Sequence, residues 1–113
     1  MSTPSADTPV LDLVTQLNTA SIERSKLDPS TLMLVRIAAL VAVDAPPISY
    51  LTNIGVAGDV GVEGDDVQEV LIAVAPIVGT ARVASAAGKM VRALGLAIAV
   101  ADSESEERAD GAE

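Results

Sequence analysis

Cysteine and histidine are absent from the chain, and Tyr50 is its only aromatic residue. Without cysteine there can be no disulfide, no thiol redox chemistry and no thiolate metal site. Without histidine there is no imidazole base and no zinc site of the usual kind. Chemistry must therefore come from carboxylates, hydroxyls, amides, lysines, arginines and a single phenol, and we expect neither a metal nor a cofactor.

Basic clusters and long apolar runs are also missing. The formal net charge is −9 and the basic residues are scattered, so the sequence does not indicate nucleic-acid binding. The longest apolar run begins at Leu32 and is broken by Arg36, well short of the roughly 18 residues of a membrane span. The first ten residues lack the basic start and apolar segment of a signal peptide, so we expect a cytoplasmic protein.

Small aliphatic side chains are what the sequence has in abundance. They make up most of the apolar half of the chain, and each buries little area in a core. The mean hydropathy of +0.44 is nevertheless high for a lone soluble domain. We infer that other subunits cover some apolar faces, so that the protein is an oligomer.

Helix start and stop residues recur along the chain. An amphipathic segment begins at Pro9 and fades near residue 18. Asp28 as a cap and Pro29 at the first helical position predict a second helix, which runs to about Val43. This helix is apolar on most sides, so we expect it at the centre of the fold.

Three further helices are predicted after it. Asp44 is expected to cap the third helix and Gly61 to end it. An acidic first turn favours a fourth helix over about 65–78, and Thr80 begins a fifth that runs to about residue 101. The prediction is one small all-α domain of about five helices over residues 9–101. A disordered arm, residues 1–8, precedes it and an acidic disordered tail, residues 102–113, follows it.

This order of elements resembles a known family. The stretches that carry the resemblance are LVRIAALVAVDAP, VAGDVGVEGDDVQEVLIAVAPIVGTARV and the alanine-rich segment after them. They resemble the carboxymuconolactone decarboxylase family, which includes the alkylhydroperoxidase-D-like proteins, over roughly residues 28–98. The resemblance implies an all-helical fold that assembles with itself as a homo-trimer or hexamer.

The redox branch of that family carries Cys-x-x-Cys, followed four residues later by histidine. Alignment on Ala57 and Gly61 would put these three positions at Pro46, Ser49 and Asn53, and the acid of the preceding helix near Leu34. None of the four functional residues is retained. A thiol-dependent peroxidase activity is therefore excluded, because no thiolate can form.

The decarboxylase branch implied by the resemblance acts on a carboxylated lactone without thiol chemistry. Such a reaction needs a cation to hold the carboxylate and a proton donor for the enolate left by carbon dioxide. Arg36 is the candidate for carboxylate binding, with Arg82 as a second. Tyr50 is a candidate proton donor, while Ser49 and Asn53, four residues apart, can share one helical face near the substrate.

Each of these residues also has a simpler structural interpretation. Arg36 can form an ion pair, for which Asp44 is an obvious partner, and Tyr50 can be the largest filler of a small-residue core. Ser49 and Asn53 can be polar residues on a half-buried face. Two functions therefore stay open: a lyase acting on a small carboxylated ring, and a non-catalytic oligomer that serves assembly or binds an apolar small molecule.

Overall fold

Five α-helices and no strand make up the described part of the chain, which confirms the all-α prediction. The computed structural model describes the backbone of residues 8–111 and the side chains of residues 8–95. The predicted disordered arm therefore lies outside the described residues except for Thr8. The helices are α1 (Pro9–Arg24), α2 (Pro29–Ala42), α3 (Pro47–Asp59), α4 (Gly64–Val78) and α5 (Thr80–Gly111).

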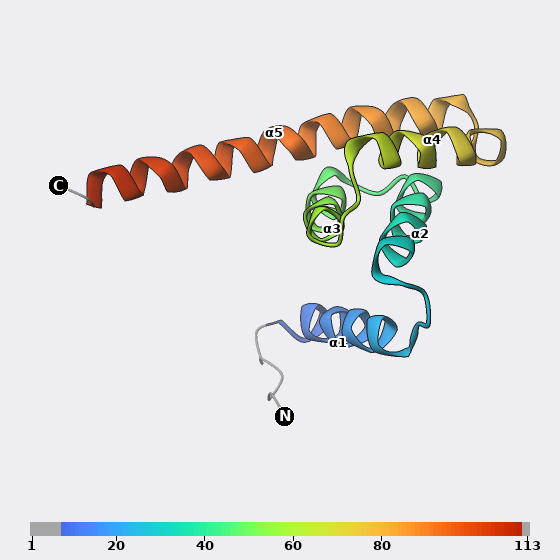
Figure 1. The fold of residues 1–113 in the computed structure, drawn as a ribbon, viewed down its shortest axis with the longest axis horizontal. Helices are drawn as coiled ribbons and strands as arrows, with labels where there is room; N and C mark the ends of the chain where they lie inside the picture. The colour runs from blue at the N-terminus through green and yellow to red at the C-terminus, as the bar shows by residue number, and fades with distance from the viewer. Residues whose placement is uncertain (1–7, 112–113) are drawn as a thin grey trace.

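Helix α2 lies at the centre of the fold, as its apolar sequence predicts. It packs against α3, α4 and α5, and α5 packs in turn against α3 and α4. Figure 1 shows that α1 stands apart from this group and that α5 extends far beyond it. The radius of gyration is 16.5 Å, compared with about 13 Å for a compact domain of this length.

Two groups of buried side chains form the core, and α2 contributes to both from one face, with Met33 and Ile37 in the first and Val41 in the second. The first joins α2, α3 and α4, and the second joins α2, α3 and α5. Alanine supplies three of the five buried residues of the second group, whereas the first is built mainly of larger aliphatic side chains. The first contains Met33, Ile37, Ala57, Val62 and Val70, and the second contains Val41, Ala45, Tyr50, Ala86 and Ala93.

The start of α2 follows the sequence prediction. The Asp28 carboxylate accepts hydrogen bonds from the Ser30 hydroxyl (2.6 Å), the Thr31 hydroxyl (2.6 Å) and the Thr31 backbone N–H (3.2 Å). Pro29 occupies the first helical position, where a missing N–H costs nothing. These hydrogen bonds, first that of Ser30 and then those of Thr31, lower the pKa of Asp28 to about 2.

We expect this cap to make the protein acid-sensitive in a defined range. The pKa of Asp28 lies below its ordinary value of 3.8, so the carboxylate stabilises the fold above about pH 4 and stops doing so as the pH falls towards 2. Asp28→Asn should keep the cap, because asparagine caps about as well, but remove this titration. The thermal midpoint should therefore fall less between pH 7 and pH 2.5 for Asp28→Asn than for the wild type. Equal falls in both proteins would contradict this assignment.

The turn between α2 and α3 differs from the prediction, because Asp44 does not cap α3. A cap at this position would bond the N–H of residue 46 or 47, and both are prolines without an N–H. Asp44 instead adopts a left-handed backbone with φ of 55°. Its Oδ1 accepts hydrogen bonds from Lys89 Nζ and Ser85 Oγ on α5, each at 2.9 Å.

This arrangement ties the α2–α3 turn to α5. The hydrogen bond from Lys89 is the main cause that lowers the pKa of Asp44, followed by the hydrogen bond from Ser85. Aspartate is among the few residues that adopt left-handed backbone at modest cost. The ion-pair partner of Asp44 is Lys89, so the predicted pairing with Arg36 is wrong.

Gly79 joins α4 to α5 in a backbone conformation that other residues avoid, with φ of 88° and ψ of 159°. Nothing lies within 4 Å of a Cβ built at this position, so the cost of a side chain there is conformational. We expect Gly79→Ala to lower the free energy of unfolding by about 1–3 kcal/mol in urea denaturation. Gly64→Ala is the matched control. Gly64 begins α4 with equal space around it, so alanine there should be neutral or stabilising.

Helix α5 also differs from the sequence prediction. Its backbone stays helical to Gly111, through most of the segment predicted as a disordered acidic tail, while residues 112–113 lie outside the described part. Residues 102–111 contain no proline, and Glu104, Glu106, Glu107, Arg108 and Ala109 among them favour helix. Within the described part of the chain, no helix combines the length and apolar character that a membrane span requires.

Candidate functional site

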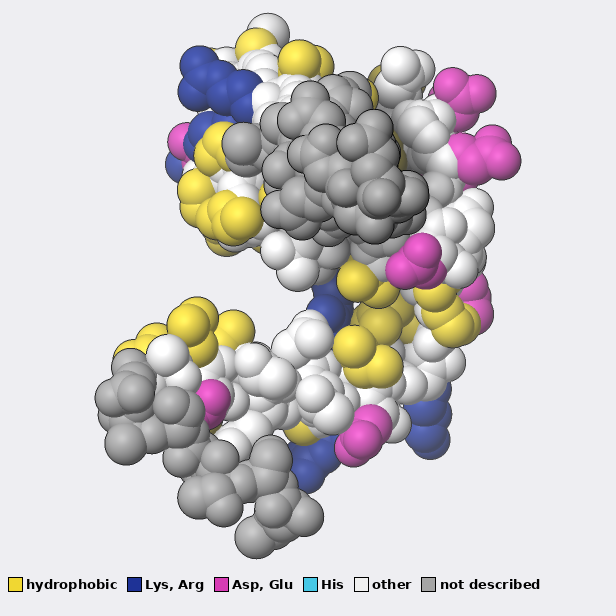
Figure 2. Space-filling view, turned by 90° about the vertical axis from the view of Figure 1, so that its left-hand side faces the viewer, with side chains coloured by type: hydrophobic (Ala, Val, Ile, Leu, Met, Phe, Trp, Pro, Cys, Tyr) yellow, Lys and Arg dark blue, Asp and Glu magenta, His cyan; other side chains and the backbone are white. Residues whose placement is uncertain are grey.

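A pocket of about 390 Å³ opens between α1, α2 and α3. Figure 2 shows the molecule deeply hollowed between the α1 region and the rest of the chain. Its walls combine aliphatic side chains with hydroxyls, amides and one guanidinium. The lining residues are Val14, Thr15, Asn18 and Ile22 of α1, Met33, Arg36 and Leu40 of α2, and Ser49, Thr52, Asn53 and Val56 of α3.

Three of the five predicted site residues line this pocket: Arg36, Ser49 and Asn53. Ser49 and Asn53 lie one turn apart on α3, which is the shared face that their spacing predicts. Arg36 projects from α2, the central helix, into the same space. The pocket thus brings together a cation and two small polar groups from two helices.

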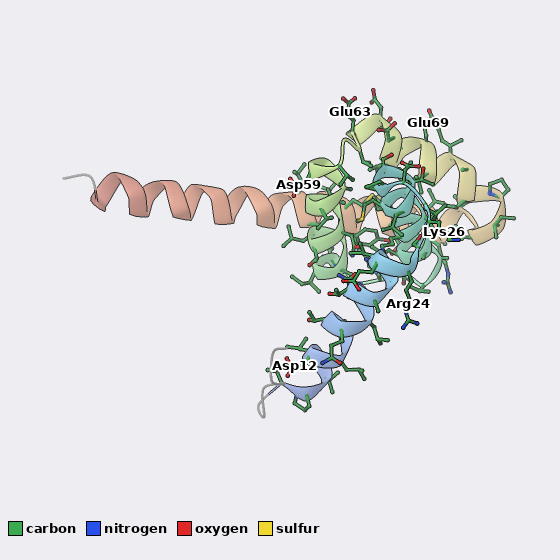
Figure 3. The ribbon with its side chains drawn as sticks, turned by 60° about the horizontal axis from the view of Figure 1, so that its bottom comes forward. Asp12, Arg24, Lys26, Asp59, Glu63 and Glu69 are labelled. Atoms are coloured by element: carbon green, nitrogen blue, oxygen red, sulfur yellow. The ribbon has the colours of Figure 1, made fainter. Side chains whose placement is uncertain are left out.

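Arg36 carries a charge without an acidic partner in the described part of the chain. Its guanidinium is half-buried and donates to the side-chain oxygen of Asn18 and, at 3.0 Å, to the Ser21 hydroxyl, both on α1. Figure 3 shows Asp59, Glu63 and Glu69 around the α3–α4 turn and α4, and Asp12 in the first turn of α1. A half-buried guanidinium with two neutral partners is well suited to bind an anion.

The polar groups of α3 have spare hydrogen-bonding capacity. Asn53 Nδ2 donates to the Ser49 carbonyl at 2.8 Å, which uses one of its two amide hydrogens. The Thr52 hydroxyl donates to the Ile48 carbonyl at 3.1 Å and keeps its oxygen as an acceptor. Ser49 is half-buried, and its hydroxyl makes no hydrogen bond to another described residue, so it can donate to a ligand or accept from one. A ligand in the pocket can therefore meet donors from α2 and α3 together.

Tyr50, the predicted proton donor, is not brought into the pocket. Its side chain is fully buried in the core between α2, α3 and α5, and its hydroxyl has no hydrogen-bond partner among the described residues. Burial, and secondly the negative charge of Asp44, raise the pKa of Tyr50 above its ordinary value. Ser49 and Tyr50 are adjacent in sequence, but a helix turns by about 100° per residue, which points the two side chains in different directions.

Arg82 also lies elsewhere. Its exposed side chain donates a hydrogen bond to the backbone carbonyl of Ala42 at the C-terminus of α2. A cation in this position satisfies an unpaired carbonyl and interacts favourably with the negative end of the helix dipole. Arg82 therefore has a structural role at the α2–α5 contact.

The contribution of α1 to the pocket was missed from the sequence. Thr15, Asn18 and Ile22 follow one another at spacings of three and four, so they share one face of α1. Thr15 and Asn18 are a signal for a polar face on this helix, whereas the apolar spacing from Pro9 predicts only the helix itself. The helix also continues to Arg24, past the residues where that spacing fades.

Comparison with known proteins decides the family. The family model described as the carboxymuconolactone decarboxylase family matches residues 8–93. The chain belongs to this family. Neither the curated proteins nor the solved structures give a significant match. The match includes helices α1 to α4 and the first part of α5, and these five helices surround the core and the pocket.

Within the carboxymuconolactone decarboxylase family, the positions implied for the redox motif can now be located in this chain. Ser49 and Asn53 line the pocket, whereas Pro46 is exposed just before α3. Leu34, at the position implied for the acid, packs against the first core group. Two of the four implied positions, those of Ser49 and Asn53, therefore line the pocket, and Arg36 joins them there.

Proposed function

We propose that the chain is a cofactor-free decarboxylase or related lyase that acts on a small carboxylated lactone or ring in the α1–α2–α3 pocket. The observation that carries this proposal is the half-buried Arg36, which faces the pocket without an acidic partner among the described residues. Family membership supports it at the level of the family. The chain offers no thiol or imidazole for another kind of catalysis.

Arg36 binds a carboxylate of the substrate in this proposal. The guanidinium presents five N–H donors and two are used by Asn18 and Ser21, which leaves three for the ligand. The apolar side chains of Met33, Leu40 and Val56 pack against the ring. A pocket of about 390 Å³ accommodates a small ring with its substituents.

Decarboxylation breaks the carbon–carbon bond to the carboxylate that leaves as carbon dioxide. The electron pair moves into the conjugated carbonyl and forms an enolate, whose oxygen accepts hydrogen bonds from Ser49 and Asn53. A proton then adds to the carbon. It comes from water, because the pocket is open to solvent and no carboxylic acid or lysine is among its lining residues.

The direct test is carbon dioxide release from γ-carboxymuconolactone and a panel of related lactones by the purified protein. Release that saturates with lactone concentration and depends on Arg36 supports the proposal. Absence of release across the panel, from protein that is folded by circular dichroism, removes it. Binding without release, measured by calorimetry, would reduce the site to a carboxylate-binding site.

A second candidate function is a non-catalytic oligomer, trimeric or hexameric, that assembles with itself or binds an apolar ligand. Six apolar side chains on α1 favour assembly, because they have exposed fractions of 46–72% that a partner subunit could cover. They are Val10, Leu11, Leu13, Val14, Leu17 and Ile22. A smaller apolar pocket of about 120 Å³ between α3 and α5, lined by Leu51, Ile54, Gly55, Ala93 and Leu94, is a site for an apolar group.

Sedimentation velocity separates assembly from the monomeric alternative. We expect the wild type to sediment as a trimer or hexamer, and Leu13→Asp, which places a charge on the exposed face of α1, to shift it towards the monomer. A wild-type monomer at all concentrations would remove the assembly function. Thermal-shift screening with apolar compounds tests the smaller pocket.

A further inference from the structure

Helix α1 is the most loosely attached element of the described fold. It makes no extensive packing contact with another helix there, and a short segment, residues 25–28, links it covalently to α2. Figure 1 shows it separated from the other four helices. A helix of this length is marginally stable by itself in water, so the contacts that hold α1 in place also preserve its helical state.

The hydrogen bonds between α1 and α2 come from Arg36. The guanidinium donates to Asn18 and to Ser21, which lie three residues apart and so share one face of α1. The same face carries Val14, Thr15 and Ile22, which form one wall of the pocket. The group proposed to bind the substrate is therefore also the group that holds the pocket wall in place.

We propose that α1 is a hinged lid on the pocket, that Arg36 is its latch, and that Asn18 and Ser21 are positioning residues that hold the guanidinium for the ligand. The role of the ligand in this inference rests on the proposed function, whereas the latch itself does not. Two neutral acceptors orient the guanidinium without neutralising it. An acidic residue at either position would hold α1 more firmly but would compete with the carboxylate of the substrate.

Amide hydrogen–deuterium exchange in the absence of ligand tests the latch. Arg36→Gln removes the charge and most of the N–H donors. We therefore expect α1 to fray and its amides to exchange about two- to tenfold faster. The amides of α2, α3 and α4 serve as an internal measure of folding and should be unchanged. Ser21→Ala, which removes one of the two acceptors, should give a smaller acceleration in the same segment.

Asn18→Asp separates a positioning role from a purely structural one. The variant is nearly isosteric and converts a neutral acceptor into a charged one, so α1 should exchange about two- to fivefold more slowly. Its affinity for γ-carboxymuconolactone, measured by calorimetry, should nevertheless fall about tenfold or more, because the Arg36 charge is then compensated within the protein. Opposite changes in the two measurements are the signature of the proposal.

Gln16→Glu is the matched control, because it adds the same charge to an exposed position of α1 that does not line the pocket. It should leave both measurements near their wild-type values. The proposal is overturned if Arg36→Gln leaves α1 exchange unchanged, or if Asn18→Asp binds the lactone as tightly as the wild type. If the wild type binds no lactone, the proposed function fails, and the exchange measurements alone decide whether the latch exists.

Discussion

Replacement of Arg36 by glutamine is expected to lower kcat/KM for γ-carboxymuconolactone by about 10- to 100-fold. Removal of one partner of a charged hydrogen bond typically costs about 1.5–3 kcal/mol, which corresponds to this range. Two features of the structure set the size of the effect. The guanidinium is half-buried in the pocket, and no carboxylate among the described residues shares its charge.

Arg36→Lys is the informative companion variant. Lysine keeps the charge but presents a single ammonium in place of the planar guanidinium. It can therefore not bind a carboxylate bidentately, and it cannot donate to both Asn18 and Ser21 at once. We expect kcat/KM to lie between those of the wild type and Arg36→Gln. Equal rates for arginine, lysine and glutamine would show that the carboxylate does not bind at this position. Circular dichroism must show that each variant retains its helices.

Local residue chemistry accounts for the parts of the fold that the sequence predicted well. Helix boundaries marked by Asp28 and Gly61 are determined by a hydrogen-bond acceptor and by a backbone conformation that only a few residues adopt. These preferences act within one turn of the chain, so they can be recognised without knowledge of the tertiary structure. The spacing of Ser49 and Asn53 on one face of α3 was predictable for the same reason.

The errors arose where a residue's role depends on a partner distant in the sequence. Asp44 has the composition of a helix cap, but Lys89, 45 positions along the chain, holds its carboxylate. The choice between Arg36 and Lys89 as its partner depends on how α5 packs against the α2–α3 turn. No local pattern contains that information, because the contact is made by the assembled helices.

In the candidate site, too, local sequence predicted some roles, whereas roles that depend on distant partners were missed. Arg36 was singled out because a charge interrupts an apolar helix, and this interruption does face a pocket. Its acceptors on α1 could not be predicted, because α1 reaches it only through the geometry of the short connection 25–28. Tyr50 was singled out because it is chemically unusual in this sequence, whereas its position on α3 directs it into the core.

Replacement of Tyr50 by alanine is expected to lower the free energy of unfolding by about 3–5 kcal/mol, which is typical when a large buried aromatic side chain is truncated. Tyr50 is the largest fully buried side chain of a core made mainly of alanine and valine. Those neighbours are too short to fill the space that it would leave. Since small domains are stable by only about 5–15 kcal/mol, much of the helical circular dichroism signal should be lost at moderate urea concentrations.

Tyr50→Phe tests both the packing argument and the placement of the tyrosine outside the site. The ring is kept, and the lost hydroxyl has no hydrogen-bond partner in the described part of the chain, so the variant should be at least as stable as the wild type, with a gain on the order of 1 kcal/mol. Its rate of carbon dioxide release should be unchanged, because Tyr50 does not line the pocket. A large loss of rate in a stable Tyr50→Phe protein would return the phenol to the reaction as a proton donor. A loss of stability would instead show that the buried hydroxyl has a partner, and urea denaturation beside the rate measurement distinguishes the two results.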